Sequence, residues 1–433
     1  MPVWLTYVPR QLNIWTQNTN LQQRSLYISG GGIVWGLGCI LGPIIGGAFA
    51  DSPATWRWAF YMNLVLFGLF TPVYFFVLHP SAPPSTPLSH RLKSFDYFGI
   101  LLNAGTYTTF VIGLTIGGTI WPWPSSRTIG TLATSIALLV LFAAQQKLCL
   151  LTTAQDRVFP AQFLTRRTFV LLYVAQSCVQ TALAIPIYYI PLLFQFTRGE
   201  TAVASALRLL PLVVVNIVVV FANGALLPRF KYYVPWYLAS GAFNTLGGAL
   251  FFGTLSRETS TAAVYGYSVF LALGTGLAQQ CAYSIASVKA ARHVSEAIGF
   301  INNAQIGSVV VALTLTSLIF QNVGFHDVKA ALAGSGFDDG EIRATLGGAR
   351  SALFEGVPEG VRERVEEGIV RAIRWSFFPV LLAGAIGLLA AAGMRWERLF
   401  DGENDADANE EKKEDVEKDS GGEVEKEIKK ETS

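Results

Sequence analysis

Residues 30–63 read GGGIVWGLGCILGPIIGGAFADSPATWRWAFYMN. The first part of this stretch, residues 30–50, contains no charged side chain. A helix of about 20 residues, rising about 1.5 Å per residue, crosses the roughly 30 Å hydrocarbon core of a bilayer. This stretch therefore predicts a membrane-spanning helix. Gly38, Gly42 and Gly46 recur every four residues and predict a face that a second helix approaches closely. Pro43 predicts a bend because it removes an amide donor.

Similar apolar stretches fill most of the chain. Of its 433 residues, 52% are hydrophobic and 14% are charged, whereas soluble domains have a charged share of about 25%. Transmembrane strands alternate polar and apolar residues, but LLPLVVVNIVVVFANGALL, residues 209–227, is apolar on every side. The predicted fold class is therefore all-α, a polytopic membrane protein with about ten transmembrane helices. They are expected near residues 28–50, 58–78, 97–120, 128–149, 168–192, 207–227, 235–255, 263–287, 297–320 and 376–394.

Charge is distributed unevenly along the chain. Residues 401–433 contain 14 acidic residues and 6 lysines, a net charge of −8, so residues 1–400 carry a net +10 to give the total of +2. Basic residues gather in alternate loops of the first 400 residues, which predicts that both termini are cytosolic under the positive-inside rule. The acidic end has few large apolar side chains and is predicted to be a disordered cytosolic tail.

One long loop, residues 322–374, is predicted to lie outside. Its end reads PEGVRERVEEGIVRAIRW, residues 358–375, and places Val361, Val365, Ile369 and Ile373 at four-residue spacing. Charged residues occupy the other faces, which predicts an amphipathic helix. We favour a packing or interfacial helix over an outer lid. Residues 1–17 contain no continuous apolar stretch, and the sequence assigns them no role.

The spacing within residues 38–63 is more specific than a glycine stripe. The pattern GxxxGPxxGG, followed by WRWxFxxN, resembles the antiporter motif and next-helix start of the major facilitator superfamily, specifically its fungal fourteen-helix drug:proton antiporters. The stretches NTNLQQRSLY (18–27), ALRLLP (206–211) and GALLPRFKYYVPWYLASG (224–241) resemble other segments of this multidrug and toxin efflux family. The antiporter-motif residues are Gly38, Gly42, Pro43, Gly46 and Gly47.

The resemblance covers residues 18–400 and implies that the ten predicted helices correspond to family helices five to fourteen, without the first four. It also implies residence in the plasma membrane or the vacuolar membrane. The implied regions are an N-terminal segment and cytosolic loop (1–27), a two-helix remnant of the N-terminal bundle (28–78), two central linker helices (97–149), a C-terminal six-helix bundle (168–394) with the outer loop 322–374, and the acidic tail (401–433).

A proton-driven antiporter needs a titratable group on its transport path. The predicted spans hold no carboxylate or histidine near mid-depth, and Asp51, Asp96 and Glu296 lie at span ends, where capping is the favoured role. The spans contain neutral amides instead, and two interpretations stay open: hydrogen bonds between helices or binding of largely apolar solutes in a central cavity. These substrate-binding candidates are Gln176, Gln180, Asn216, Gln279, Gln280, Asn302, Asn303 and Gln305.

Two arginines near span ends, Arg208 and Arg229, are gating candidates. Snorkelling to the bilayer interface is the alternative for Arg208. The sequence contains no phosphate-binding GxxxxGK[ST] loop, nucleophile triad or metal-ligand cluster. We therefore predict that the protein is not an enzyme and has no catalytic residues, cofactor, metal or nucleic-acid partner.

The leading prediction is a transmembrane transporter of small apolar or amphipathic compounds that exports drugs or toxins by alternating access across the lipid bilayer. The resemblance implies protons as the coupling ion. The alternative is a truncated, non-transporting membrane protein or an incomplete gene model, because the family's first four helices are missing.

Overall fold

The computed structural model describes residues 21–50, 52–53, 55–76, 95–153, 156–290, 293–333, 337–347 and 358–399. Within these ranges the regular structure is helical, and β-type pairing is limited to two isolated bridges. The all-α prediction is therefore confirmed. The expectations for residues 1–17, for Asp51 and for the acidic tail lie outside the described residues.

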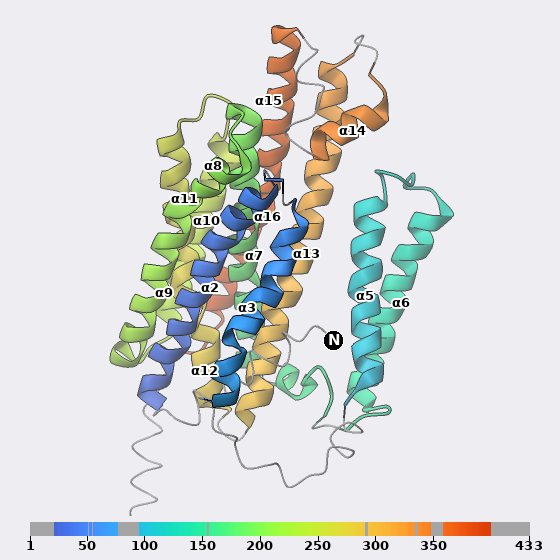
Figure 1. Cartoon of the computed structure of the whole chain (residues 1–433). Helices are drawn as coiled ribbons and strands as arrows, with labels where there is room; N and C mark the ends of the chain where they lie inside the picture. The colour runs from blue at the N-terminus through green and yellow to red at the C-terminus, as the bar shows by residue number, and fades with distance from the viewer. Residues whose placement is uncertain are drawn as a thin grey trace, which may run out of the picture.

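Every predicted apolar stretch contains a helix (Figure 1). Seven helical stretches of the described chain are long and apolar enough to cross a membrane, namely α5, α6, α7, α8–α9, α11–α12, α13 and α15–α16. The count of ten spans stays a prediction. The helices are α2 (Leu21–Ala50), α3 (Arg57–Phe76), α5 (Tyr97–Ile116), α6 (Ser126–Leu148), the 3₁₀ helix η1 (Ala161–Thr165), α7 (Arg167–Arg198), α8 (Ala202–Leu207), α9 (Leu210–Phe230), α10 (Val234–Thr254), α11 (Thr261–Ala278), α12 (Cys281–Lys289), α13 (Val294–Ala331), α14 (Asp339–Gly347), α15 (Glu359–Ser376) and α16 (Phe378–Ala392).

Two stretches differ from the prediction. The stretch expected as one helix at 263–287 is interrupted at Gln279 and Gln280, which separate α11 from α12. Helix α13 continues past the expected end at 320, because its extension packs against α14 and α15 and buries Val328. Tertiary contacts outside the apolar stretch thus lengthen this helix.

The amphipathic pattern near the end of the long loop forms helix α15, as predicted. Val365, Ile369 and Ile373 are buried, and α15 packs along α13 and α7 (Figure 1). These apolar side chains therefore contact protein along one face. The structure supports the packing interpretation of this helix.

The hydrophobic core lies in the bundle formed by α7, α9, α10, α11, α12, α13, α15 and α16. Near the α15 end, Phe251 and Phe377 stack with ring centroids 4.2 Å apart. Helices α10 and α16 approach closely, because a Cβ atom at Gly384 would lie 2.7 Å from Thr245 Cα. Small residues thus bring helices together in this bundle, as is common where no hydrophobic force acts between helices in lipid.

Helix α2 joins the bundle through α8 and α9. A Cβ atom at Gly32 would lie 2.8 Å from Val220 Cγ1, and one at Gly36 would lie 2.6 Å from Ile217 Cδ1. Both neighbouring atoms belong to α9, and both distances are shorter than a real Cβ atom would allow. The absence of side chains at these two glycines therefore sets the distance between α2 and α9.

The predicted contact along the Gly38, Gly42 and Gly46 stripe is not seen among the described helices and stays a prediction. No described atom lies within 4 Å of the Cβ position at any of the three. Successive residues of a helix are about 100° apart, so Gly38 lies about 200° around the axis from Gly36 and faces away from α9. Of the antiporter-motif glycines, Gly47 is the packed one, with its Cβ position 3.3 Å from α8.

Helices α5 and α6 pack on each other as a hairpin, and α5 contacts the bundle at α13 (Figure 1). Many of the large apolar side chains of this hairpin are exposed, among them Leu101, Ile136 and Val140. Such a surface is suited to contact with lipid.

Candidate functional site

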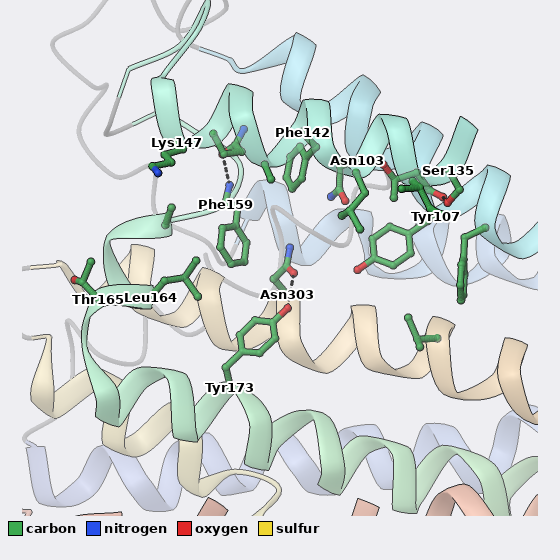
Figure 2. A pocket seen from close by; sticks show the side chains of 18 residues that line it. Asn103, Tyr107, Ser135, Phe142, Lys147, Phe159, Leu164, Thr165, Tyr173 and Asn303 are labelled. Atoms are coloured by element: carbon green, nitrogen blue, oxygen red, sulfur yellow. Dashed lines mark hydrogen bonds between the residues drawn. The ribbon is translucent and has the colours of Figure 1, made fainter. Parts of the chain in front are cut away.

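A cavity of about 830 Å³ lies between the α5–α6 hairpin, η1, α7 and α13 (Figure 2). This volume is within the range of sites for drug-sized molecules, about 300–1,000 Å³. The described side chains that line it are Asn103, Thr106, Tyr107, Phe110, Ser135, Ile136, Leu139, Phe142, Ala143, Gln146, Lys147, Phe159, Ala161, Leu164, Thr165, Tyr173, Asn303 and Val311.

The polar groups of this cavity are mostly neutral. Tyr173 of α7 donates a hydrogen bond from its hydroxyl to Asn303 Oδ1 of α13, at 3.1 Å. Figure 2 shows Asn103 and Tyr107 of α5 on the side of the cavity across from that pair. Lys147 contributes a charge near the C-terminal end of α6. A few polar groups on an apolar and aromatic surface suit solutes with both apolar and polar parts.

The residues of the hairpin that line the cavity lie on one face of each helix, because they recur with helical spacing. On α5 the lining positions are 103, 106, 107 and 110, and on α6 they include 135, 139, 142 and 146. Offsets of three, four and seven residues place side chains on one helix face. Sequence reasoning missed this site, although the neutral polar residues on one face of an otherwise apolar span were a usable signal.

One end of the hairpin is fixed by Asp96, whose side chain is buried. Its Oδ1 accepts from the backbone N–H of Gly99 at 2.8 Å and from Gln145 Nε2 at 2.9 Å. Its Oδ2 accepts from Gln146 Nε2 at 2.7 Å and from the N–H of Val158 at 3.3 Å. The predicted capping role of Asp96 is confirmed, and the carboxylate also joins the start of α5, the end of α6 and the connection to η1.

Gln146 connects Asp96 to the wall of the cavity. Its Oε1 accepts from the N–H of Phe159 at 2.9 Å, and both residues line the cavity. Phe159 packs in turn on Tyr173 and Phe300, with ring centroids 6.3 Å and 5.4 Å away. The shape of this end of the cavity therefore depends on Asp96, which does not itself line it.

The hairpin meets the bundle where Tyr107 crosses α13. A Cβ atom at Gly307 would overlap the Tyr107 hydroxyl. Glycine at this position therefore lets α5 approach α13 closely enough for the cavity walls to meet.

Most of the amides predicted to bind substrate lie inside the bundle. Gln176 Nε2 donates to the Gln279 carbonyl at 3.3 Å, and Asn216 Nδ2 donates to Thr275 Oγ1 at 2.8 Å. Tyr283 bonds both Asn302 and Gln305. These contacts match the interpretation as hydrogen bonds between helices.

Two predicted amides reach cavities. Asn303 lines the 830 Å³ cavity. Gln180 lines a second cavity, of about 520 Å³, on the neighbouring faces of α7 and α13. Gln280 lies near α2, with its Nε2 3.4 Å from the Cβ position of Gly32. Substrate binding by these amides stays a prediction.

The two gating candidates differ in their surroundings. Arg208 bonds both oxygens of Glu200, at 2.6–3.1 Å, and donates to Tyr265 Oη at 2.9 Å. Its guanidinium also lies over the Phe194 ring, 5.1 Å from the centroid. This cluster joins α7, the start of α9 and α11, whereas Arg229 is exposed in the last turn of α9.

Comparisons with known proteins identify a family. The model of the Major Facilitator Superfamily matches residues 9–313. The chain is 38% identical over 393 residues to "Efflux pump patC" of Aspergillus clavatus, covering 90% of this chain and 71% of that protein. It is 37% identical over 385 residues to "MFS-type transporter patC" of Penicillium expansum, with coverages of 88% and 70%. It is 37% identical over 399 residues to "Efflux pump alnA" of Emericella nidulans, with coverages of 90% and 71%.

Proposed function

Because this chain belongs to the major facilitator superfamily of membrane transporters, we propose that it exports small apolar or amphipathic compounds by alternating access. The observation that carries the proposal is the 830 Å³ cavity, with its apolar lining and its few neutral hydrogen-bonding groups. We assign the hydrogen-bonded pair of Tyr173 and Asn303 as the site that binds the polar part of the solute. The relatives named efflux pumps support export as the direction of transport. They also favour a transporter over a non-transporting membrane protein.

Location, topology and energy source are parts of the same proposal. We place both termini in the cytosol on the alternation of loop charge, and we place the protein in the plasma or vacuolar membrane on the family resemblance. We keep the division into bundle remnant, linker helices and six-helix bundle on the family resemblance. Proton coupling also rests on that resemblance. Among described residues, the buried carboxylates Asp96 and Glu366 are engaged by hydrogen bonds or ion pairs, so neither is assigned as the coupling acid.

The test is transport of ethidium, a fluorescent amphipathic cation, in vesicles that contain the purified chain and carry an imposed proton gradient. Val311→Trp places an indole in the cavity and is expected to stop ethidium movement. Val218→Trp is the matched control, because Val218 lies on α9 with 61% of its surface exposed. Equal transport by the two variants would exclude this cavity, and no movement with the unmodified chain would count against ethidium export.

A further inference from the structure

A further cavity lies at the end of the bundle where α7 begins. Its volume is about 360 Å³ and its character is basic. The connection before α7, the end of α12 and the segment after α16 contribute to it. We call it the cationic cavity, and its lining residues are Arg166, Arg167, Thr168, Phe169, Lys289 and Arg395.

The charges of this cavity are only partly neutralised. Lys289 forms an ion pair with Glu397, which also accepts a hydrogen bond from the Tyr233 hydroxyl at 3.0 Å. Arg167 donates to the carbonyl of Gly393 at 2.9 Å. Arg166 and Arg395 are exposed. Arg395 also attracts Glu397, which helps to lower the pKa of that carboxyl. The cavity therefore retains a net positive charge and attracts anions.

An acidic segment of the same chain starts beside this cavity. Leu399 is buried, and its N–H donates to the Lys231 carbonyl at 2.9 Å, so the backbone is held at this end of the bundle. Residues 401–411 follow, with six acidic residues and no basic one. Arg395, which lines the cavity, lies four residues before Leu399. A chain reaches at most about 3.3–3.6 Å per residue, so a few residues of this segment suffice to return to the cavity.

We propose that residues 401–411 dock on the cationic cavity and place their carboxylates against Arg166 and Arg395. Exposed ion pairs are individually weak, but the covalent connection gives the segment an effective concentration in the millimolar range. The pair between Glu397 and Lys289 shows the same chemistry just before the segment begins. The docked segment neutralises the arginines at the start of α7 and after α16. It thereby links the tail to the two helices that pack together on this side of the bundle. This contact does not depend on transport.

The experiment measures how fast a lysine-specific protease cuts the full chain after Lys412 and Lys413, directly behind the acidic segment. The chain is held in neutral detergent at low ionic strength. A cavity variant, Arg166→Gln with Arg395→Gln, is expected to be cut roughly fivefold faster, which is the protection that two or three weak ion pairs supply. A control variant, Arg127→Gln with Arg364→Gln, removes two exposed charges, one at the start of α6 and one on α15, and is expected to be cut at the unmodified rate.

A second variant changes the segment and leaves the folded bundle untouched. Replacement of Asp401, Asp405 and Asp407 by Asn and of Glu403 by Gln is expected to give the same acceleration. High salt is expected to remove the difference, because it screens exposed charges. Equal cutting of the unmodified chain and both variants at low salt would overturn the proposal. The occupant would instead be a lipid headgroup if the unmodified chain and the segment variant bound phosphatidylserine vesicles, the cavity variant did not, and all three chains were cut alike.

Discussion

Substitution of Asp96 by Asn tests whether this residue does more than cap α5. Asn is as good an N-cap residue as Asp, so a pure capping role predicts almost no change in stability. The structure predicts a large change, because each carboxylate oxygen accepts two hydrogen bonds. Whichever oxygen the amide nitrogen replaces, two donors lose this acceptor, and at least one of the two is buried. At about 1–3 kcal/mol for each unsatisfied donor, the expected loss is about 2–6 kcal/mol.

The assay is unfolding of the purified chain in detergent, by denaturant or heat. Asp156→Asn is the control, because Asp156 is exposed and accepts from the neighbouring Thr153. A change within about 0.5 kcal/mol is expected there, as for most surface substitutions. Asp96→Asn should also weaken ethidium binding, because Gln146 lines the cavity. If Asp96→Asn is as stable as the control, the carboxylate is only a cap and the proposed anchor is refuted.

Three further predictions follow from contacts elsewhere. Gly307→Ala is expected to disturb the hairpin contact and to weaken ethidium binding, and Tyr107→Phe in the same chain should restore binding, because it removes the overlapping oxygen. Gly384→Ala should cost about 1–3 kcal/mol in denaturant unfolding through overpacking, whereas Gly253→Ala, with no atom within 4 Å of its Cβ position, should not destabilise the chain. Burial raises the pKa of Glu397, but hydrogen bonding and attraction by its lysine partner outweigh this and lower the pKa below its usual value. The stabilisation that these interactions give to the folded chain is present above the pKa of Glu397 in the unfolded chain. It is lost as the pH falls through the lowered pKa of the folded chain. Glu397→Gln should therefore lose less stability than the unmodified chain when acidified below about pH 4.5, and equal losses in pH-dependent unfolding would contradict this.

The surroundings of the neutral amides could be predicted only in part from the sequence. Their presence in apolar spans predicts partners, since an unpaired amide in hydrocarbon is costly. Hydrogen bonds to other elements are formed by Gln176, Asn216, Asn302, Asn303 and Gln305. The sequence could not tell a partner on another helix from a solute, because that depends on which faces meet. Asn216 faces Thr275, 59 residues away, while Asn303 on α13 faces the cavity. Adjacent residues on one helix, Asn302 and Asn303, thus have different surroundings.

The class of this protein and the approximate positions of its helices follow from the amino-acid sequence alone. A membrane helix satisfies its backbone hydrogen bonds within its own segment and needs only an apolar stretch of sufficient length, and both are local properties. Helix contacts, by contrast, depend on side-chain shape over long separations, because lipid supplies no hydrophobic force between helices. The tertiary structure therefore decided that α2 packs on α9 through Gly32 and Gly36, and not through the motif stripe. It also decided that Asp96 meets Gln146, 50 residues away, and so shapes the cavity between hairpin and bundle.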